Sequence, residues 1–174
     1  VTGPGVTAAG ELFFTLSRTF VGDTSFAVQL RDNGGTENGG SDTSASQTFT
    51  ITVRPLNDPP SFELSAESVT VGEDGPLQRL NNFALDLTAG PSNEASQRLT
   101  FVVTNSNKAL FLPAGQPAIS PAGQLTFHPA LQANGTAVVS VVLQDSGGVA
   151  FGGIDRSAPQ TFSIEVTAQN DPPV

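Results

Sequence analysis

Residues 47–53 read Gln-Thr-Phe-Thr-Ile-Thr-Val, and residues 160–166 read Gln-Thr-Phe-Ser-Ile-Glu-Val. In both stretches apolar and polar side chains alternate, which places Phe49, Ile51 and Val53 on one face of an extended chain. Alternation with a period of two indicates a half-buried β-strand. Similar short runs recur along the chain between Gly, Pro, Asn and Asp residues, which favour turns. The sequence therefore predicts an all-β fold.

The two stretches belong to a long internal repeat. Asn57-Asp58-Pro59-Pro60 recurs at residues 170–173, an offset of 113 (170 minus 57). At this offset residues 4–60 align with residues 117–173 without a gap, and 25 of the 57 positions are identical. Self-similarity of this kind is typical of tandem repeat proteins. The predicted organisation is the C-terminal half of a first repeat at 1–56, a linker at 57–60, a complete repeat at 61–169 and the start of the next linker at 170–174.

A repeat of about 110 residues with about seven short strands fits an immunoglobulin-like antiparallel β-sandwich. Strands of the complete repeat are predicted near residues 68–71, 80–87, 99–104, 118–120, 125–128, 137–143 and 160–167. Strands of the half repeat are predicted at 12–16, 25–30 and 47–53. Residues 80–87 also fit helical spacing, but the Asn81-Asn82 pair and the surrounding strands favour a strand.

The half repeat has no counterpart of residues 61–116, so it would leave a sheet edge and half of a core uncovered. We therefore expect the chain to be a piece of a longer array, and it opens at Val1 without a visible signal peptide. The alternative is that another copy supplies the missing strands by β-augmentation.

Several segments resemble a known group of repeats. Residues 123–148 (GQLTFHPALQANGTAVVSVVLQDSGG), residues 152–166 (GGIDRSAPQTFSIEV) and the Asn-Asp-Pro-Pro motif resemble the Ig-like or cadherin-like tandem repeats of large secreted bacterial surface proteins. Residues 56–62 are also similar to the linker between cadherin domains, and residues 71–75 resemble the Glu-Asp-Gly near the start of the bacterial repeats. The resemblance implies tandem Ig-like/cadherin-like β-sandwiches in an extracellular protein, with neighbouring repeats as partners.

Composition narrows the classes of function. The 174 residues include seven Lys and Arg against sixteen Asp and Glu, a formal net charge of −9, which repels phosphate backbones and argues against nucleic acid binding. There is no Cys, so disulfides and Cys-bound zinc are excluded. No apolar run reaches the roughly 18–20 residues that span a membrane, so no membrane span is predicted.

The acidic residues indicate a cation at the ends of the repeat. Calcium binds about six to eight oxygen atoms from carboxylates, amides, carbonyls and water. In a seven-stranded sandwich, the connections that follow the predicted strands 80–87 and 137–143 both lie at the end where the linker enters. We expect calcium there, with Asn57, Asp58, Glu94, Asp145 and Asp155 as candidate ligands. The candidates at the opposite end are Glu73, Asp74, Asn170 and Asp171, and those of the half repeat are Asp32 and Asp42.

Turn formation is the alternative interpretation of the same residues. Asp and Asn beside Gly-Gly pairs accept hydrogen bonds from nearby backbone N–H groups, and Asn-Asp before Pro-Pro makes an extended connector. The Asp-x-Asp pair of cadherins and the 12-residue calcium loop are both absent from the sequence. Both interpretations stay open from the sequence.

No catalytic residue is predicted. The only His, His128, aligns with Thr15 in the first repeat, which argues against a general base. The only Lys, Lys108, lies in a predicted loop, which argues against a Lys–Asn isopeptide cross-link in the core. The expected function is a non-enzymatic spacer or adhesion segment of a bacterial surface protein, stiffened by calcium between repeats. The alternatives are a fibre subunit assembled by strand exchange and a carbohydrate-binding module that binds cell-surface glycans. The second is disfavoured because the chain has no Trp or Tyr to stack on sugars.

Overall fold

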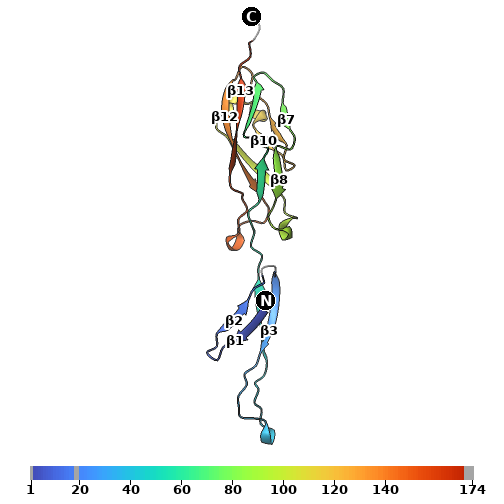
Figure 1. Ribbon diagram of the computed structural model, residues 1–174, viewed down its shortest axis with the longest axis vertical. Coiled ribbons are helices and arrows are strands. Elements are labelled where there is room, and N and C mark those ends of the chain that lie inside the picture. The colour runs from blue at the N-terminus through green and yellow to red at the C-terminus, as the bar shows by residue number, and fades with distance from the viewer. Residues whose placement is uncertain (1, 18–19, 171–174) are drawn as a thin grey trace. The chain divides into compact units, whose positions relative to one another are not determined.

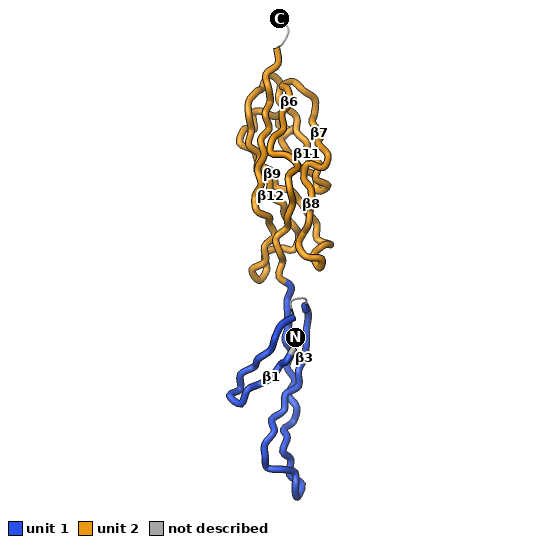
Figure 2. Tube along the Cα trace, in the orientation of Figure 1, with its two compact units in different colours: residues 1–55 blue, residues 56–174 orange. Residues whose placement is uncertain are grey.

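The computed structural model describes residues 2–17 and 20–170. The chain divides into two compact units, residues 1–55 and residues 56–174 (Figure 2). The described part consists of β-strands joined by loops and short 3₁₀ turns. None of its helical turns is long and apolar enough to cross a membrane.

The second unit is a β-sandwich (Figure 1). Its strands are β5 (Ser61–Leu64), β6 (Ser68–Gly72), β7 (Gln78–Leu80), β8 (Ala84–Thr88), β9 (Thr100–Asn105), β10 (Ala118–Ile119), β11 (Leu125–Phe127), β12 (Gly135–Gln144) and β13 (Gln160–Thr167). One sheet has the order β6-β13-β12-β9, and the facing strands form the sheets β10-β11-β7 and β5-β8. Its 3₁₀ turns are η2 (Ser92–Glu94), η3 (Lys108–Leu110), η4 (Pro113–Gly115) and η5 (Ala150–Gly152).

The core of this unit lies between the two layers. Val139, Val141 and Leu143 alternate along β12 and are fully buried, as a period of two requires for one face of a strand. The ring of Phe162 packs edge-on against that of Phe83, with 4.7 Å between the centroids. Burial of this apolar surface is the main source of the stability of the sandwich.

The first unit contains two β-hairpins. Its strands are β1 (Thr2–Val6), β2 (Leu12–Thr15), β3 (Gly22–Val28) and β4 (Gln47–Val53), and η1 (Glu37–Gly39) lies between the last two. β1 pairs with β2, and β3 pairs with β4. The register of the second hairpin matches that of β12 and β13, because Gly22 faces Val53 as Gly135 faces Val166.

The strand predicted at residues 80–87 is wrong as a single element. β7 and β8 belong to different sheets. Between them Asn82 has a φ of 53°, a left-handed conformation that interrupts an extended strand. The break turns Phe83 into the core, where it is 1% exposed. β1 and β5 are additional strands that the sequence pattern does not predict.

Candidate functional site

Residues 144–157, which run from the last residue of β12 into the connection to β13 and are called loop 144–157 below, form one side of the candidate site. The backbone N–H of Asp145 donates to the carbonyl of Asp155 at 3.1 Å, which closes the base of the loop. The Asp145 carboxylate in turn accepts a hydrogen bond from the N–H of Gly147, with 2.8 Å from N to Oδ1. The loop therefore holds Asp145 in one orientation, and this side chain is only 5% exposed.

The linker residue Asn57 is seated in this loop. Its Nδ2 donates to Asp145 Oδ1 at 3.0 Å and to the carbonyl of Ile154 at 2.7 Å. Its Oδ1 accepts from Gln97 Nε2 at 2.8 Å, and its backbone carbonyl accepts from the N–H of Ile154 at 2.9 Å. Side chain and backbone of a single linker residue are therefore fixed to the sandwich that follows. We call this arrangement the Asn57 anchor.

The next linker residue, Asp58, is held by η2 and not by loop 144–157. The backbone N–H of Asp58 donates to both carboxylate oxygens of Glu94, at 3.2 and 3.3 Å. Glu94 lies in η2 and is 5% exposed. A carboxylate that accepts backbone N–H bonds is stabilised in its charged form, which offsets part of the cost of burying it.

Two glycines make room for the linker. A methyl group at Gly147 would overlap the side-chain oxygen of Asn57 and lie 2.7 Å from Gln97 Nε2. A methyl group at Gly153 would lie 3.0 Å from the Asn57 Cβ and 3.1 Å from its backbone nitrogen. Gly147 and Gly153, one glycine of each Gly-Gly pair, are therefore where Asn57 and the loop approach each other.

Two oxygen atoms at this site lack a hydrogen-bond partner. They are Asp145 Oδ2 and Gln97 Oε1, and both are buried. A buried acceptor without a donor is costly, and a bound cation or water is a common remedy. Oxygen atoms are also the ligands that calcium prefers. Within the described residues, no group of three or more His, Cys, Asp or Glu residues could hold a metal ion, so amide and carbonyl oxygens would have to complete any such site.

The structure brings together four of the five candidates at this end. Asn57, Asp58, Glu94 and Asp145 meet through the hydrogen bonds given above. Asp155 does not join them, because its Oδ2 accepts from Gln144 Nε2 at 2.9 Å and its role is to brace the loop.

The candidates at the opposite end act on nearby backbone and amide groups. Glu73 is 5% exposed and accepts from the N–H of Gln169 at 2.9 Å and from Asn134 Nδ2 at 3.1 Å. Asp74 accepts from the N–H of Gln132 at 2.7 Å. Glu73 therefore fixes the chain next to Asn170, which is exposed. Asp171 lies outside the described residues.

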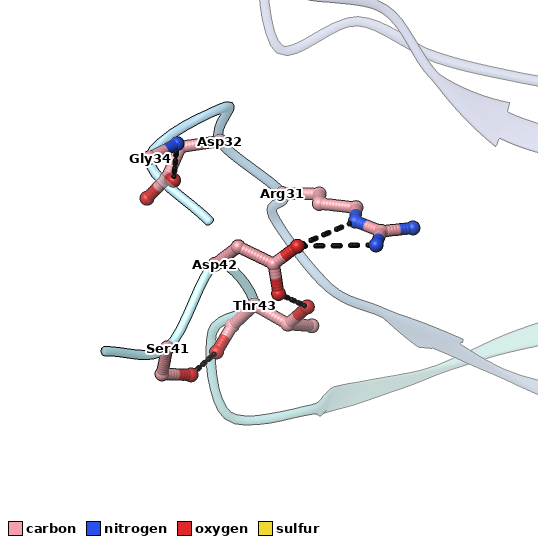
Figure 3. A network of polar contacts seen from close by, with 6 residues as sticks. All are labelled: Arg31, Asp32, Gly34, Ser41, Asp42 and Thr43. Atoms are coloured by element: carbon pink, nitrogen blue, oxygen red, sulfur yellow. Dashed lines mark hydrogen bonds and ion pairs between the residues drawn. The ribbon is translucent and has the colours of Figure 1, made fainter. Parts of the chain in front are cut away.

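The two candidates of the first unit take part in turn formation (Figure 3). Asp32 Oδ1 accepts from the N–H of Gly34 at 2.7 Å. Asp42 pairs with Arg31 at 3.1 Å and accepts from Thr43 Oγ1 at 2.9 Å. The Asp32 contact is a backbone N–H bond of the kind that the turn interpretation describes, whereas the Asp42 carboxylate contacts a guanidinium and a hydroxyl.

Two groups at the site are not among the predicted residues. Gln97 orients Asn57, and the Ile154 backbone contributes both a donor and an acceptor. Gln97 has no counterpart in the first repeat, so the internal comparison gives no signal for it. Backbone groups of a loop carry no side-chain signal at all, although Gly147 and Gly153 mark where they are accessible.

The family comparison falls on this unit and its linker. Residues 57–165 match the model of a family described as bacterial Ig domain, so the match begins at Asn57 itself. The chain belongs to the bacterial Ig domain family. No curated protein matches its sequence.

Solved structures show what this bacterial Ig domain resembles in fold. The crystal structure of human protocadherin-24 EC1-2 has a TM-score of 0.57 and 17% identity, over 96% of this chain and 77% of that chain. Form II of the same human protein has a TM-score of 0.54 and 16% identity over the same shares. At such identities the likeness shows the fold alone. The predicted all-β, Ig-like and cadherin-like fold is confirmed.

Proposed function

We propose that this bacterial Ig domain protein is a non-enzymatic, extracellular spacer or adhesion segment whose repeats are joined by anchored linkers. The Asn57 anchor is the observation that carries the proposal. β4 ends at Val53, so only Arg54, Pro55 and Leu56 separate a paired strand from an anchored residue. A linker this short, with a fixed φ at its proline, can adopt few backbone conformations. Junctions of this kind suit a surface protein that must hold its repeats at a defined spacing.

NMR relaxation tests the spacer role directly. In the full chain, residues of β3 and of β12 should tumble with one rotational correlation time if the linker is stiff. Asn57→Ala should let the first unit reorient independently, and its relaxation rates should then differ from those of the second. Asn93→Ala, which changes an exposed asparagine of η2, is the matched control and should change nothing. Independent tumbling in the unaltered chain would contradict the spacer role.

We further propose that calcium strengthens this junction. Asp145 Oδ2 and Gln97 Oε1 are the oxygens of this junction that are buried without a partner, and amide, backbone carbonyl and water oxygens would complete the coordination with them. When bound, calcium would offset the negative charge of the buried Asp145 carboxylate. The residues themselves position the linker with or without the ion, through the hydrogen bonds of Asn57 and of the Asp58 backbone.

A thermal melt in EDTA and in millimolar calcium, with magnesium as control, tests the calcium proposal. A ligand that binds only the folded state at about 100 times its Kd stabilises by about 2.7 kcal/mol, which raises the Tm by several degrees at this size. We expect a calcium-specific rise in the full chain, its loss in Asp145→Asn and its retention in Asp32→Asn. An equal Tm in EDTA and calcium would leave the anchored spacer intact and rule out the metal.

Strand exchange between copies is a second candidate, favoured by the exposure of the first unit. Phe13 is 54% exposed and Leu30 is 78% exposed, and among the described residues β4 has β3 as its only paired neighbour. Open strand edges and apolar faces of this kind promote assembly. Sedimentation velocity over a concentration series should show growing oligomers if exchange occurs, whereas a single monomer peak at all concentrations would exclude it.

A further inference from the structure

The loop between β3 and β4, residues 31–44, shares with loop 144–157 the hydrogen bonds that close the loop and orient its first aspartate. The N–H of Asp32 donates to the carbonyl of Asp42 at 2.9 Å, and the N–H of Gly34 donates to Asp32 Oδ1 at 2.7 Å. The corresponding bonds of loop 144–157 measure 3.1 and 2.8 Å. The two loops therefore hold their first aspartate in the same way.

The two loops also have left-handed backbone conformations, which are uncommon, at equivalent positions. Asn38 has a φ of 54° and its counterpart Phe151 a φ of 58°. Gly35 and its counterpart Gly148 have φ values of 77° and 76°. Left-handed residues at the same positions give the two loops the same backbone shape. The shape does not depend on a seated linker, because only loop 144–157 holds Asn57.

Loop 31–44 presents counterparts of two of the three groups that bind Asn57 in the second unit, and the third, Gln97, has none there. Asp32 is the counterpart of Asp145, and Ser41 is the counterpart of Ile154, whose backbone N–H and carbonyl both contact Asn57. A hollow of about 460 Å³ lies between them. It is lined by Leu30, Arg31, Asp32, Ser41, Thr43 and Ser44. Figure 3 shows Asp32 and Ser41 on the two sides of the loop, with Arg31 paired to Asp42.

We infer that loop 31–44 is a receptor for the Asn-Asp-Pro-Pro segment of another repeat. The asparagine amide of that segment donates to the Asp32 carboxylate and to the Ser41 carbonyl, and the Ser41 N–H donates to the asparagine carbonyl. The occupant is defined by chemistry, since Asn57 of the same four-residue motif occupies the equivalent loop. This inference uses the anchored linker of the proposed function but needs no metal.

A peptide titration monitored by NMR tests the inference. The ¹⁵N-labelled full chain is titrated, in EDTA, with a synthetic peptide of residues 54–62 up to millimolar concentration. We expect saturable shifts of the Gly34 and Ser41 amides and unchanged amides at Gly147 and Ile154, because Asn57 already fills loop 144–157. A peptide with Asn57→Ala and a chain with Asp32→Ala are the matched controls, and both should abolish the shifts.

A chain with Asn57→Ala provides the positive control, because its loop 144–157 is then open to the peptide. We expect the peptide to shift Gly147 and Ile154 in that variant as well as Gly34 and Ser41. Binding at loop 144–157 without binding at loop 31–44 would overturn the inference. Equal shifts with the Asn57→Ala peptide, or no shifts at either loop, would overturn it too. Because calcium is absent, these outcomes are separate from failure of the metal proposal.

Discussion

The hairpins β3–β4 and β12–β13 have the same register and are identical at 16 of the 32 positions from 22–53 against 135–166, but their surroundings are very different. Leu143 is fully buried, whereas its counterpart Leu30 is 78% exposed. Outside the hairpins the same holds, since Phe127 of β11 is fully buried whereas its counterpart Phe14 of β2 is 39% exposed. Strand pairing and loop shape are therefore determined within the hairpin, while burial depends on the half of the sandwich formed by residues 61–116. The same division applies to the linker, since loop 144–157 has Gln97 and Glu94 beside it whereas loop 31–44 has no counterpart of either.

Removing a phenylalanine ring should give the largest difference in stability loss between the two hairpins. Phe162 is 3% exposed and packs on Phe83, whereas its counterpart Phe49 is half-buried. We expect Phe162→Ala to lower the free energy of unfolding of the sandwich by about 3–5 kcal/mol in urea denaturation. Phe49→Ala should leave that transition unchanged. Equal losses in both variants would mean that the two hairpins share one core.

Breaking the Asn57 anchor should have the next largest effect. Asn57→Ala removes the amide that bonds Asp145, Ile154 and Gln97, and it leaves further buried polar atoms without partners. We expect a loss of about 1–3 kcal/mol in the same urea experiment. Asn93→Ala, at an exposed position, should stay within about 0.5 kcal/mol of the unaltered chain. A negligible loss for Asn57→Ala would show that the linker is not held.

A methyl group added at two equivalent glycines, Gly147 and Gly34, should change stability at the first and not at the second. A methyl group at Gly147 overlaps Asn57, whereas at Gly34 the nearest atom is Asp32 Oδ1 of the same loop, at 3.0 Å. Gly147→Ala should therefore displace the linker and cost about 1–2 kcal/mol of sandwich stability, measured by thermal melting. Gly34→Ala should leave the melt unchanged. If Gly147→Ala is also neutral, the close approach of linker and loop is not a feature of the protein in solution.

The smallest expected difference concerns a bond that both hairpins share. The Leu143 N–H donates to Ser157 Oγ at 3.0 Å, and the Leu30 N–H donates to Ser44 Oγ at 2.9 Å. Ser157→Ala and Ser44→Ala should each speed amide exchange at the bonded leucine, and the buried bond at Leu143 should contribute about 0.5–1.5 kcal/mol to stability. An effect at only one leucine would show that the two loops differ in solution.

Much of the fold follows from local pattern. The strand at residues 160–167 lies where the alternation predicts it, because each side chain there faces either the core or solvent. The strand predicted at residues 80–87 fails because Asn82 adopts a left-handed conformation. Alternation does not encode such a break, since the break depends on the packing of Phe83 against the opposite sheet.

The candidate site is predicted only in part, for a similar reason. The Asn-Asp motif, Glu94 and Asp145 are recognisable because carboxylates and amides at loop ends suggest a common site. Gln97 and the Ile154 backbone are not, because their roles arise from long-range contacts between loops. The sequence also leaves calcium and turn formation as alternatives. Asp145 and Asp155 lie in the same Gly-rich loop, yet the Asp145 side chain contacts the linker whereas the Asp155 side chain braces its own loop.

Amide hydrogen exchange at Ile154 and Ser41 is the most direct test of the anchored linker. These two residues are counterparts in the two loops, and the Ile154 N–H donates to the Asn57 carbonyl at 2.9 Å. We expect Ile154 to exchange at least about tenfold more slowly than Ser41, a difference of about 1.4 kcal/mol in local opening. In Asn57→Ala the two rates should converge. Equal exchange of Ile154 and Ser41 in the unaltered chain would contradict the anchor, and with it the stiff junction on which the proposed spacer function depends.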